Sequence, residues 1–141
     1  MMQPNPPSVV AIFNSLDEIL DMVRVAFEAQ GFVVATARLA DIQSGVLDLI
    51  AFVQEHKPDA LVYDIPRPYE ANWNVLRMLR ETDSLQDLVW VITTTNKDAL
   101  ERAVPKTNAI EIVLGKPYTV DEVIEAVRKG LLTDGHGPSK E

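Results

Sequence analysis

Residues 57–73, KPDALVYDIPRPYEANW, form the stretch around which the rest of the chain can be arranged. The run 60–63 is short and wholly apolar, which is typical of a strand buried on both faces of a parallel sheet. Asp64 follows it, and the prolines at 66 and 68 prevent the strand from continuing. We therefore expect a carboxylate at the carboxyl end of a central strand, the edge where ligands bind in open α/β sheets. This segment alone is equally compatible with a turn or loop-capping role for Asp64.

Composition and charge limit the possible function classes. The chain has 141 residues, of which 47% are hydrophobic, and a net charge of −8. Such a length fits one domain, which we expect over residues 8–132, between a flexible arm (1–7) and a flexible tail (133–141). The negative charge argues against binding to nucleic acid or to an anionic membrane surface.

The cysteine and histidine counts restrict metal and redox chemistry. There is no cysteine, which excludes disulfides and thiolate sites, and the only histidines are His56 and His136. Two histidines so far apart in the sequence argue against a zinc site. The N-terminus has no apolar signal core and no run approaches the roughly 20 apolar residues of a membrane span, so we expect a cytoplasmic protein.

Strand-like and helix-like segments alternate along the whole chain. Ser15 and Glu18 match a capping box at the start of the first helix, and Thr119 and Glu122 match another at the start of the last. Asn72 is expected to cap the third helix or to adopt a left-handed turn, and Thr95 or Asn96 to cap the fourth. The expected strands cover 8–13, 32–39, 60–63, 88–93 and 109–114, and the expected helices 15–30, 46–56, 73–82, 97–104 and 120–132, with a loop at 40–45.

This alternation predicts an α/β fold with a parallel sheet covered on both faces. Right-handed crossovers favour a flavodoxin-like, doubly wound (βα)5 arrangement with strand order 2-1-3-4-5. Its switch point would lie between strands one and three, which places Asn14 and Ser15 beside Asp64. Thr93 and Lys116 would lie at the same edge, at the ends of strands four and five.

The residues expected at this edge can handle an anion. A carboxylate such as Asp64 can attack a phosphoryl group, while the Lys116 ammonium neutralises a phosphoryl oxygen and the Thr93 hydroxyl donates to another. The simpler interpretation is a surface ion pair between Asp64 and Lys116, worth about 0–1 kcal/mol.

The order of these residues resembles that of the receiver domains of two-component response regulators. The resemblance covers about residues 8–132. It rests on Asp64 in PDALVYDIPRP, followed by Pro68 four residues later, on Thr93 in VWVIT, and on Lys116-Pro117. It implies that Asp64 is a phosphoacceptor, supplied by a histidine kinase, a phosphotransfer protein or a small phosphodonor. It also implies Mg²⁺ and an output surface on helix four, strand five and helix five, without classical enzyme activity.

One departure from the family affects the metal. Receivers carry two acidic residues after strand one, where this chain has Asn14 and Ser15. The remaining candidate Mg²⁺ ligands are Asp64, the backbone carbonyl of Pro66 and the Asn14 and Ser15 side chains, a set that is poor in the carboxylates Mg²⁺ prefers. We therefore expect an impaired Mg²⁺ site and a direct Asp64–Lys116 pair.

A second departure is Val113, which replaces the aromatic residue that the family uses as a switch in strand five. Tyr118 is expected to serve in packing. Flavodoxin-type, dinucleotide and cobalamin sites are less compatible with the sequence, because the chain lacks a glycine-rich phosphate loop and a suitably placed histidine.

Two functions remain open from the sequence. One is a single-domain receiver in a phosphorelay that uses Asp64, Thr93 and Lys116; the other is a pseudo-receiver that binds a protein without phosphorylation. In either case the signal would pass through a partner or a homodimer. The expected contact surface includes Val104, Val113 and the surroundings of Glu122 and Arg128.

Overall fold

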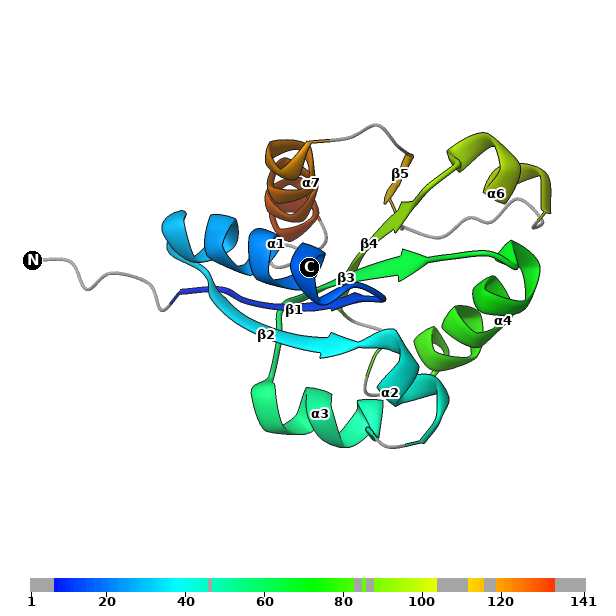
Figure 1. Cartoon of the computed structure of the whole chain (residues 1–141). Coiled ribbons are helices and arrows are strands. Elements are labelled where there is room, and N and C mark those ends of the chain that lie inside the picture. The colour runs from blue at the N-terminus through cyan, green and yellow to red at the C-terminus, as the bar shows by residue number, and fades with distance from the viewer. Residues whose placement is uncertain are drawn as a thin grey trace, which may run out of the picture.

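The computed structural model describes residues 7–45, 47–82, 85, 88–103, 112–115 and 119–133. Its centre is a five-stranded parallel sheet in the order β2-β1-β3-β4-β5, as predicted from the sequence (Figure 1). The strands are β1 (Val9–Asn14), β2 (Val33–Arg38), β3 (Ala60–Ile65), β4 (Val89–Thr94) and β5 (Ile112–Gly115). The helices are α1 (Asp17–Ala29), α2 (Leu39–Gln43), α3 (Leu49–His56), α4 (Tyr69–Arg80), α6 (Lys97–Ala103) and α7 (Val120–Thr133).

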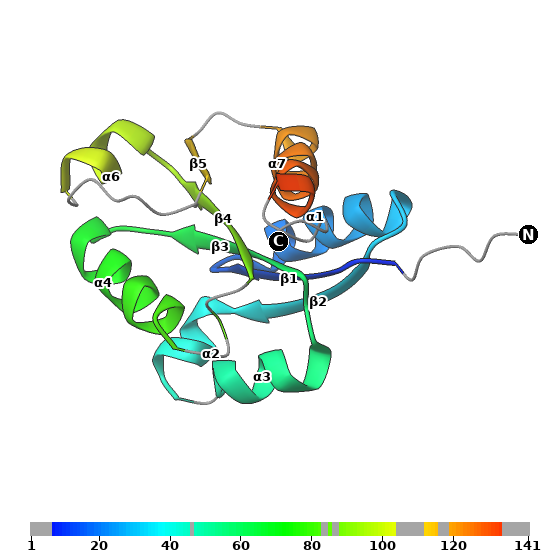
Figure 2. The same cartoon turned by 180° about the vertical axis from the view of Figure 1, so that it is seen from behind.

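Helices cover both faces of the sheet, as seen from opposite sides in Figures 1 and 2. Because successive strand side chains point to opposite faces, each central strand contributes to two separate cores. On one face, Val10, Ile12, Val62 and Val91 pack with residues of α1 and α7. On the other face, a second core joins the sheet to α2, α3, α4 and α6; its largest fully buried members are Phe13, Leu61, Ile65, Leu76, Leu85, Trp90, Ile92 and Leu100.

Several predicted helix boundaries are wrong. Residues 40–45 were expected to be a loop, but most of them belong to α2. The next helix begins at Leu49 instead of residue 46, because the Asp48 side chain accepts from the amides of Ile50 and Ala51 and so fixes its start. Helix α4 begins at Tyr69 instead of residue 73, so Asn72 lies inside its first turn and is neither a cap nor left-handed.

Of the side-chain caps predicted at helix starts, the one for α1 is wrong and those for α7 and α6 are confirmed. Ser15 does not cap α1: the helix starts at Asp17, and the turn before it is closed by the Asn14 side chain, which accepts from the Leu16 amide at 3.1 Å. The capping box of α7 is confirmed by reciprocal bonds between Thr119 and Glu122 at 2.8 and 3.1 Å. Asn96 also caps α6 as expected, accepting from the Ala99 amide at 3.0 Å.

Some apolar side chains on or beside the helices are exposed. Leu16 is 55% exposed because it lies before α1, and Val75 is 37% exposed on the outer side of α4. Ala51 is exposed, while Leu49 and Val53 fill the core beneath α3. Among the described residues, none of the helices has the length and apolar character needed to cross a membrane.

Candidate functional site

Strand periodicity places three polar side chains on the same face of the sheet. Asn14 follows Val10 and Ile12 on β1, Asp64 follows Ala60 and Val62 on β3, and Thr93 follows Val89 and Val91 on β4. All three therefore share the α1 and α7 face, at the carboxyl ends of adjacent strands. The switch point of the strand order also lies between β1 and β3, as expected for a ligand crevice.

Asp64 and Thr93 form the centre of this site. They are aligned partners across β3 and β4, and the Thr93 hydroxyl donates to Asp64 Oδ1 at 2.8 Å. Thr93 is 3% exposed and Asp64 is half-buried, so the carboxylate retains access to solvent while its hydroxyl partner is fixed inside the protein. A hydrogen bond to an ionised group is stronger than one between neutral groups, so it holds the carboxylate in one orientation.

Asn14 is also buried at this edge, with 9% exposure. Its amide oxygen accepts from the Leu16 backbone, so the side chain is used in the turn that leads to α1. Ser15 is exposed and makes no cap to α1. The two positions where receivers have acidic residues thus carry a turn-forming amide and a surface hydroxyl.

Pro66, predicted to offer its carbonyl oxygen to a metal, accepts a hydrogen bond from the protein itself. The Asn72 side-chain nitrogen donates to the carbonyls of Pro66 at 2.9 Å and Pro68 at 3.0 Å. The side-chain oxygen of Asn72 accepts a hydrogen bond from the side-chain nitrogen of Gln43, in α2, at 2.9 Å. This network was not foreseen from the sequence, because α2 itself was expected to be a loop.

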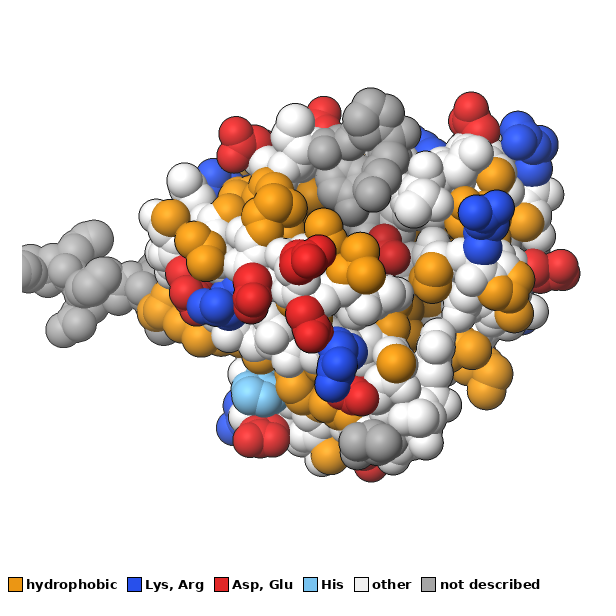
Figure 3. Space-filling view, in the orientation of Figure 1, with side chains coloured by type: hydrophobic (Ala, Val, Ile, Leu, Met, Phe, Trp, Pro, Cys, Tyr) orange, Lys and Arg blue, Asp and Glu red, His pale blue; other side chains and the backbone are white. Residues whose placement is uncertain are grey.

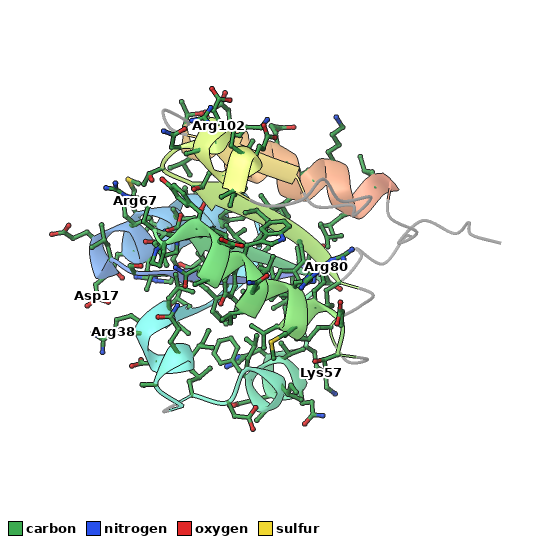
Figure 4. All side chains as sticks on the ribbon, turned by 90° about the vertical axis from the view of Figure 1, so that its right-hand side faces the viewer. Asp17, Arg38, Lys57, Arg67, Arg80 and Arg102 are labelled. Atoms are coloured by element: carbon green, nitrogen blue, oxygen red, sulfur yellow. The ribbon has the colours of Figure 1, made fainter. Side chains whose placement is uncertain are left out.

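The nearest acidic side chain along the chain after β1 is Asp17, which is also engaged elsewhere. Arg38, at the end of β2, lies 3.7 Å from Asp17 and 3.8 Å from Asp41. Figure 4 shows Asp17 and Arg38 next to each other at the left of the view, with Arg67 above them. The Asp17 side chain is 70% exposed, so this ion pair is a surface contact that holds the Asp17 carboxylate beside Arg38.

These donors fit a resident Mg²⁺ poorly. In the part of the chain that the structure describes, no three acidic, histidine or cysteine side chains gather into a metal-binding group. Asp64 is the one carboxylate among the predicted ligands, and the Asn14 and Pro66 oxygens already accept protein hydrogen bonds. Mg²⁺ requires nearly octahedral oxygen coordination and is usually bound through carboxylates, so this donor set falls short.

Other predicted residues lie outside the described parts of the chain. Lys116, Pro117, Tyr118 and Val104 fall in this group, and so does any pair between Lys116 and Asp64; Val113 is described only as part of the β5 backbone. Arg128 contacts Gln30 at 2.9 Å and Glu125 at 3.3 Å and lies over the Phe32 ring. It therefore contacts the end of α1 and the segment that leads into β2.

The face seen in Figure 3 carries acidic, basic and apolar side chains side by side. Exposed apolar groups include Met22 and Val25 of α1, at 50% and 58% exposure, and Met78 of α4 at 68%. Single exposed apolar residues of this kind are common on folded proteins and do not define a binding surface by themselves.

Comparisons with known proteins identify the fold. No family model and no curated protein matches the chain. Among solved structures, a response regulator receiver protein from Sinorhizobium medicae is 20% identical, with a TM-score of 0.66 over 91% of this chain and 97% of that one. A sensor protein from Polaromonas sp. is 18% identical, with a TM-score of 0.70 over 88% and 95% of the two chains.

A third similar structure is described as a transiently phosphorylated switch in bacterial signal transduction. It is 19% identical, with a TM-score of 0.67 over 89% of this chain and 94% of that one. The predicted flavodoxin-like fold with strand order 2-1-3-4-5 is therefore confirmed, and these neighbours match nearly the full described domain.

Proposed function

We propose that this chain is a receiver module of two-component signalling, with Asp64 as its phosphoacceptor and an impaired Mg²⁺ site. The observation that carries the proposal is the aligned pair of Asp64 and Thr93 at the carboxyl ends of β3 and β4, joined at 2.8 Å. The receiver fold of the structural neighbours supports it. We expect the module to act as a signalling component rather than as a classical enzyme.

The proposed chemistry is phosphoryl transfer to one carboxylate oxygen. A carboxylate oxygen of Asp64 would attack phosphorus of a phosphohistidine or an acyl phosphate. A new O–P bond forms while the P–N or P–O bond to the donor breaks, and the donor leaves with the electron pair. Thr93, already within hydrogen-bond distance of the carboxylate, would donate to a phosphoryl oxygen. Lys116 is proposed as the neutralising cation.

The absence of an acidic pair makes this reaction slow. Attack by a carboxylate on a negatively charged phosphoryl group is repulsive, and the donor set described above fits Mg²⁺ poorly. Asn14 is committed to the Leu16 amide and cannot turn to the crevice without breaking that bond. The expected rate of phosphorylation is therefore below that of receivers with two acidic residues at these positions.

A second candidate function is a pseudo-receiver that binds its partner without phosphorylation. It is favoured by one feature, the protein-internal hydrogen bonds that hold Asn14 and Pro66. In such a module the crevice would keep one arrangement, and the specificity would come from the outer surface alone.

We propose the α6–β5–α7 face as the partner surface in both cases. Gly115, the last residue of β5, approaches α6 so closely that an added Cβ would lie 2.9 Å from the Lys97 backbone nitrogen. A displacement at the end of β5 would therefore be passed to the start of α6. The partner would be a histidine kinase, a phosphotransfer protein, a downstream protein or a second copy of the chain.

The deciding experiment is incubation with acetyl phosphate and Mg²⁺, followed by intact-mass measurement. A gain of one phosphoryl group in the native chain, absent from Asp64→Asn, supports the phosphoacceptor. Asn14→Asp/Ser15→Asp is the matched positive control, because it restores both acidic positions. Labelling of that variant without labelling of the native chain would favour the pseudo-receiver.

A further inference from the structure

Three consecutive threonines at the exit of β4 each hydrogen-bond to a different residue of the β3–α4 segment. Thr93 donates to the Asp64 carboxylate at 2.8 Å, and Thr94 donates to the Ile65 carbonyl at 3.0 Å. The Thr95 hydroxyl lies 2.9 Å from the Tyr69 hydroxyl, where either group can donate. The exit of β4 is thus attached to β3 and α4 at every residue.

These bonds lie on alternating sides of the sheet. Thr93 faces the α1 and α7 side together with Asp64, and Thr94 is fully buried toward the other side. Thr95 lies just beyond the strand, where Tyr69, the first residue of α4, reaches it. Because only one residue separates Thr93 from Thr95, a displacement of either one moves the other.

Tyr69 is well placed to act as a fixed support. Its ring packs against the core that contains Trp73 and Leu76, so the hydroxyl extends from an anchored side chain. Thr95 in turn precedes Asn96, whose side chain accepts from the Ala99 amide at the start of α6. A continuous set of contacts therefore runs from Asp64 through Thr93 and Thr95 to the first turn of α6.

We propose that Tyr69 is a positioning residue for the Asp64–Thr93 pair and that its bond to Thr95 couples Asp64 to the start of α6. A group bound at Asp64 that attracts the Thr93 hydroxyl shifts the exit of β4. The Tyr69–Thr95 bond then determines whether that shift is taken up locally or moves Asn96 and α6. This inference deepens the proposed receiver function by naming the route from its site to the proposed partner face.

The test measures amide hydrogen exchange of Ala99 by NMR in the unphosphorylated full chain, so it does not depend on phosphoryl transfer. The variants are Tyr69→Phe, Thr93→Val and the double variant. Each single change is expected to speed exchange of Ala99 about fivefold, the equivalent of one net hydrogen bond of about 1 kcal/mol. If the two residues act through one route, the double variant exchanges no faster than the faster single variant.

Conservative changes separate positioning from general loosening. Thr95→Ser keeps the hydroxyl and is expected to match the native exchange rate, whereas Thr95→Val is expected to match Tyr69→Phe. Thr82→Val is the control at the other end of α4, where the hydroxyl contacts the Met78 carbonyl at 3.5 Å, and should leave Ala99 unchanged.

The proposal is overturned if Thr93→Val leaves Ala99 exchange at the native rate, or if the effects of the two single changes multiply in the double variant. Either result would mean that Tyr69 stabilises its own loop without reaching Asp64. Failure of the chain to accept phosphate would count against the proposed phosphoacceptor and would leave this coupling result intact.

Discussion

Thr93 and Asp64 occupy aligned positions on neighbouring parallel strands, and the hydroxyl of the first donates to the carboxylate of the second at 2.8 Å. The two residues are far apart in the sequence, because α4 and the start of β4 lie between them. The contact exists because β3 and β4 are adjacent in the sheet and because both residues fall on the same side of their strands. It gives the carboxylate a fixed hydrogen-bond partner within the protein.

The two buried threonines are expected to differ in their contribution to stability. Thr94→Val should lower the free energy of unfolding by about 1–3 kcal/mol, because the Ile65 carbonyl would lose a bond where both groups are fully buried. Thr93→Val should cost about 1 kcal/mol, because water can replace the hydroxyl on half-buried Asp64. Urea unfolding measures both; an equal or larger loss for Thr93→Val would contradict this ranking.

Restoring the acidic pair should create a Mg²⁺ site. We expect Asn14→Asp/Ser15→Asp to gain thermal stability with millimolar Mg²⁺ in a saturable manner, because a bound ion stabilises only the folded chain. The native chain should respond to Mg²⁺ no more than to NaCl of equal ionic strength. Thermal unfolding scans give the measurement, and adding Asp64→Asn to the double variant should remove the response. A saturable Mg²⁺ effect on the native chain would show that its donor set suffices.

Asn72 should stabilise the loop after β3. Asn72→Ala removes the donor to the Pro66 and Pro68 carbonyls and the acceptor for Gln43, so we expect a loss of about 1–2 kcal/mol in the free energy of unfolding. Asn74→Ala, exposed two positions further along α4, is the matched control and should stay within about 0.5 kcal/mol. Chemical denaturation compares the two variants, and equal losses would argue against the role given to Asn72.

Gly130 should resist replacement even though it lies within a helix. Glycine to alanine normally favours a helix by about 1 kcal/mol. Here an added Cβ would overlap Cγ1 of Val89, a buried residue at the start of β4, so Gly130→Ala should instead destabilise the protein by about 1–3 kcal/mol. In a Val89→Ala background the same change should become neutral or stabilising. The test compares the free energies of unfolding of the native protein, Gly130→Ala, Val89→Ala and the double variant. Gly130→Ala should lower this free energy in the native background and should leave it unchanged or raise it in the Val89→Ala background.

High pH should weaken the fold through Tyr63. Burial raises the pKa of Tyr63 to about 12 from its ordinary value of 10. Between these two values the folded chain binds the phenol proton more tightly than the unfolded chain does, so this contribution to stability is lost as pH rises from 10 toward 12. Urea unfolding at pH 9 and at pH 11 should show a smaller decrease for Tyr63→Phe than for the native chain. Parallel decreases in the two proteins would contradict the prediction.

Much of the fold could be predicted because the patterns that specify it are local. Apolar runs, capping residues and glycines fixed five alternating units, and the crossover rule then limited the sheet to few strand orders. The predictions for α2 and for the start of α4 were wrong. In both places the helix begins without a side-chain cap from its own N-cap residue, Arg38 or Pro68, so the usual sequence signal was missing.

The candidate site could be predicted in outline for a similar reason. Asp64 and Thr93 lie at the ends of strongly apolar strands, so their shared edge followed from the strand order. The partners of Asn14, Asn72 and Tyr69 could not be predicted. Each bond depends on the direction of one side chain in a turn or at a helix start, and in the cases of Asn72 and Tyr69 the partner comes from another part of the chain.

The sequence by itself determined the five repeated units, the parallel sheet and the presence of a carboxylate at the edge where its strands end, because hydrophobic periodicity and chain connectivity are properties of the sequence. Only the tertiary structure decided how the polar groups at that edge are satisfied. Asp64 is joined to Thr93, Gln43 to Asn72 and Tyr69 to Thr95 because strand order and helix packing bring hydrogen-bonding groups from distant parts of the sequence within 3 Å of one another.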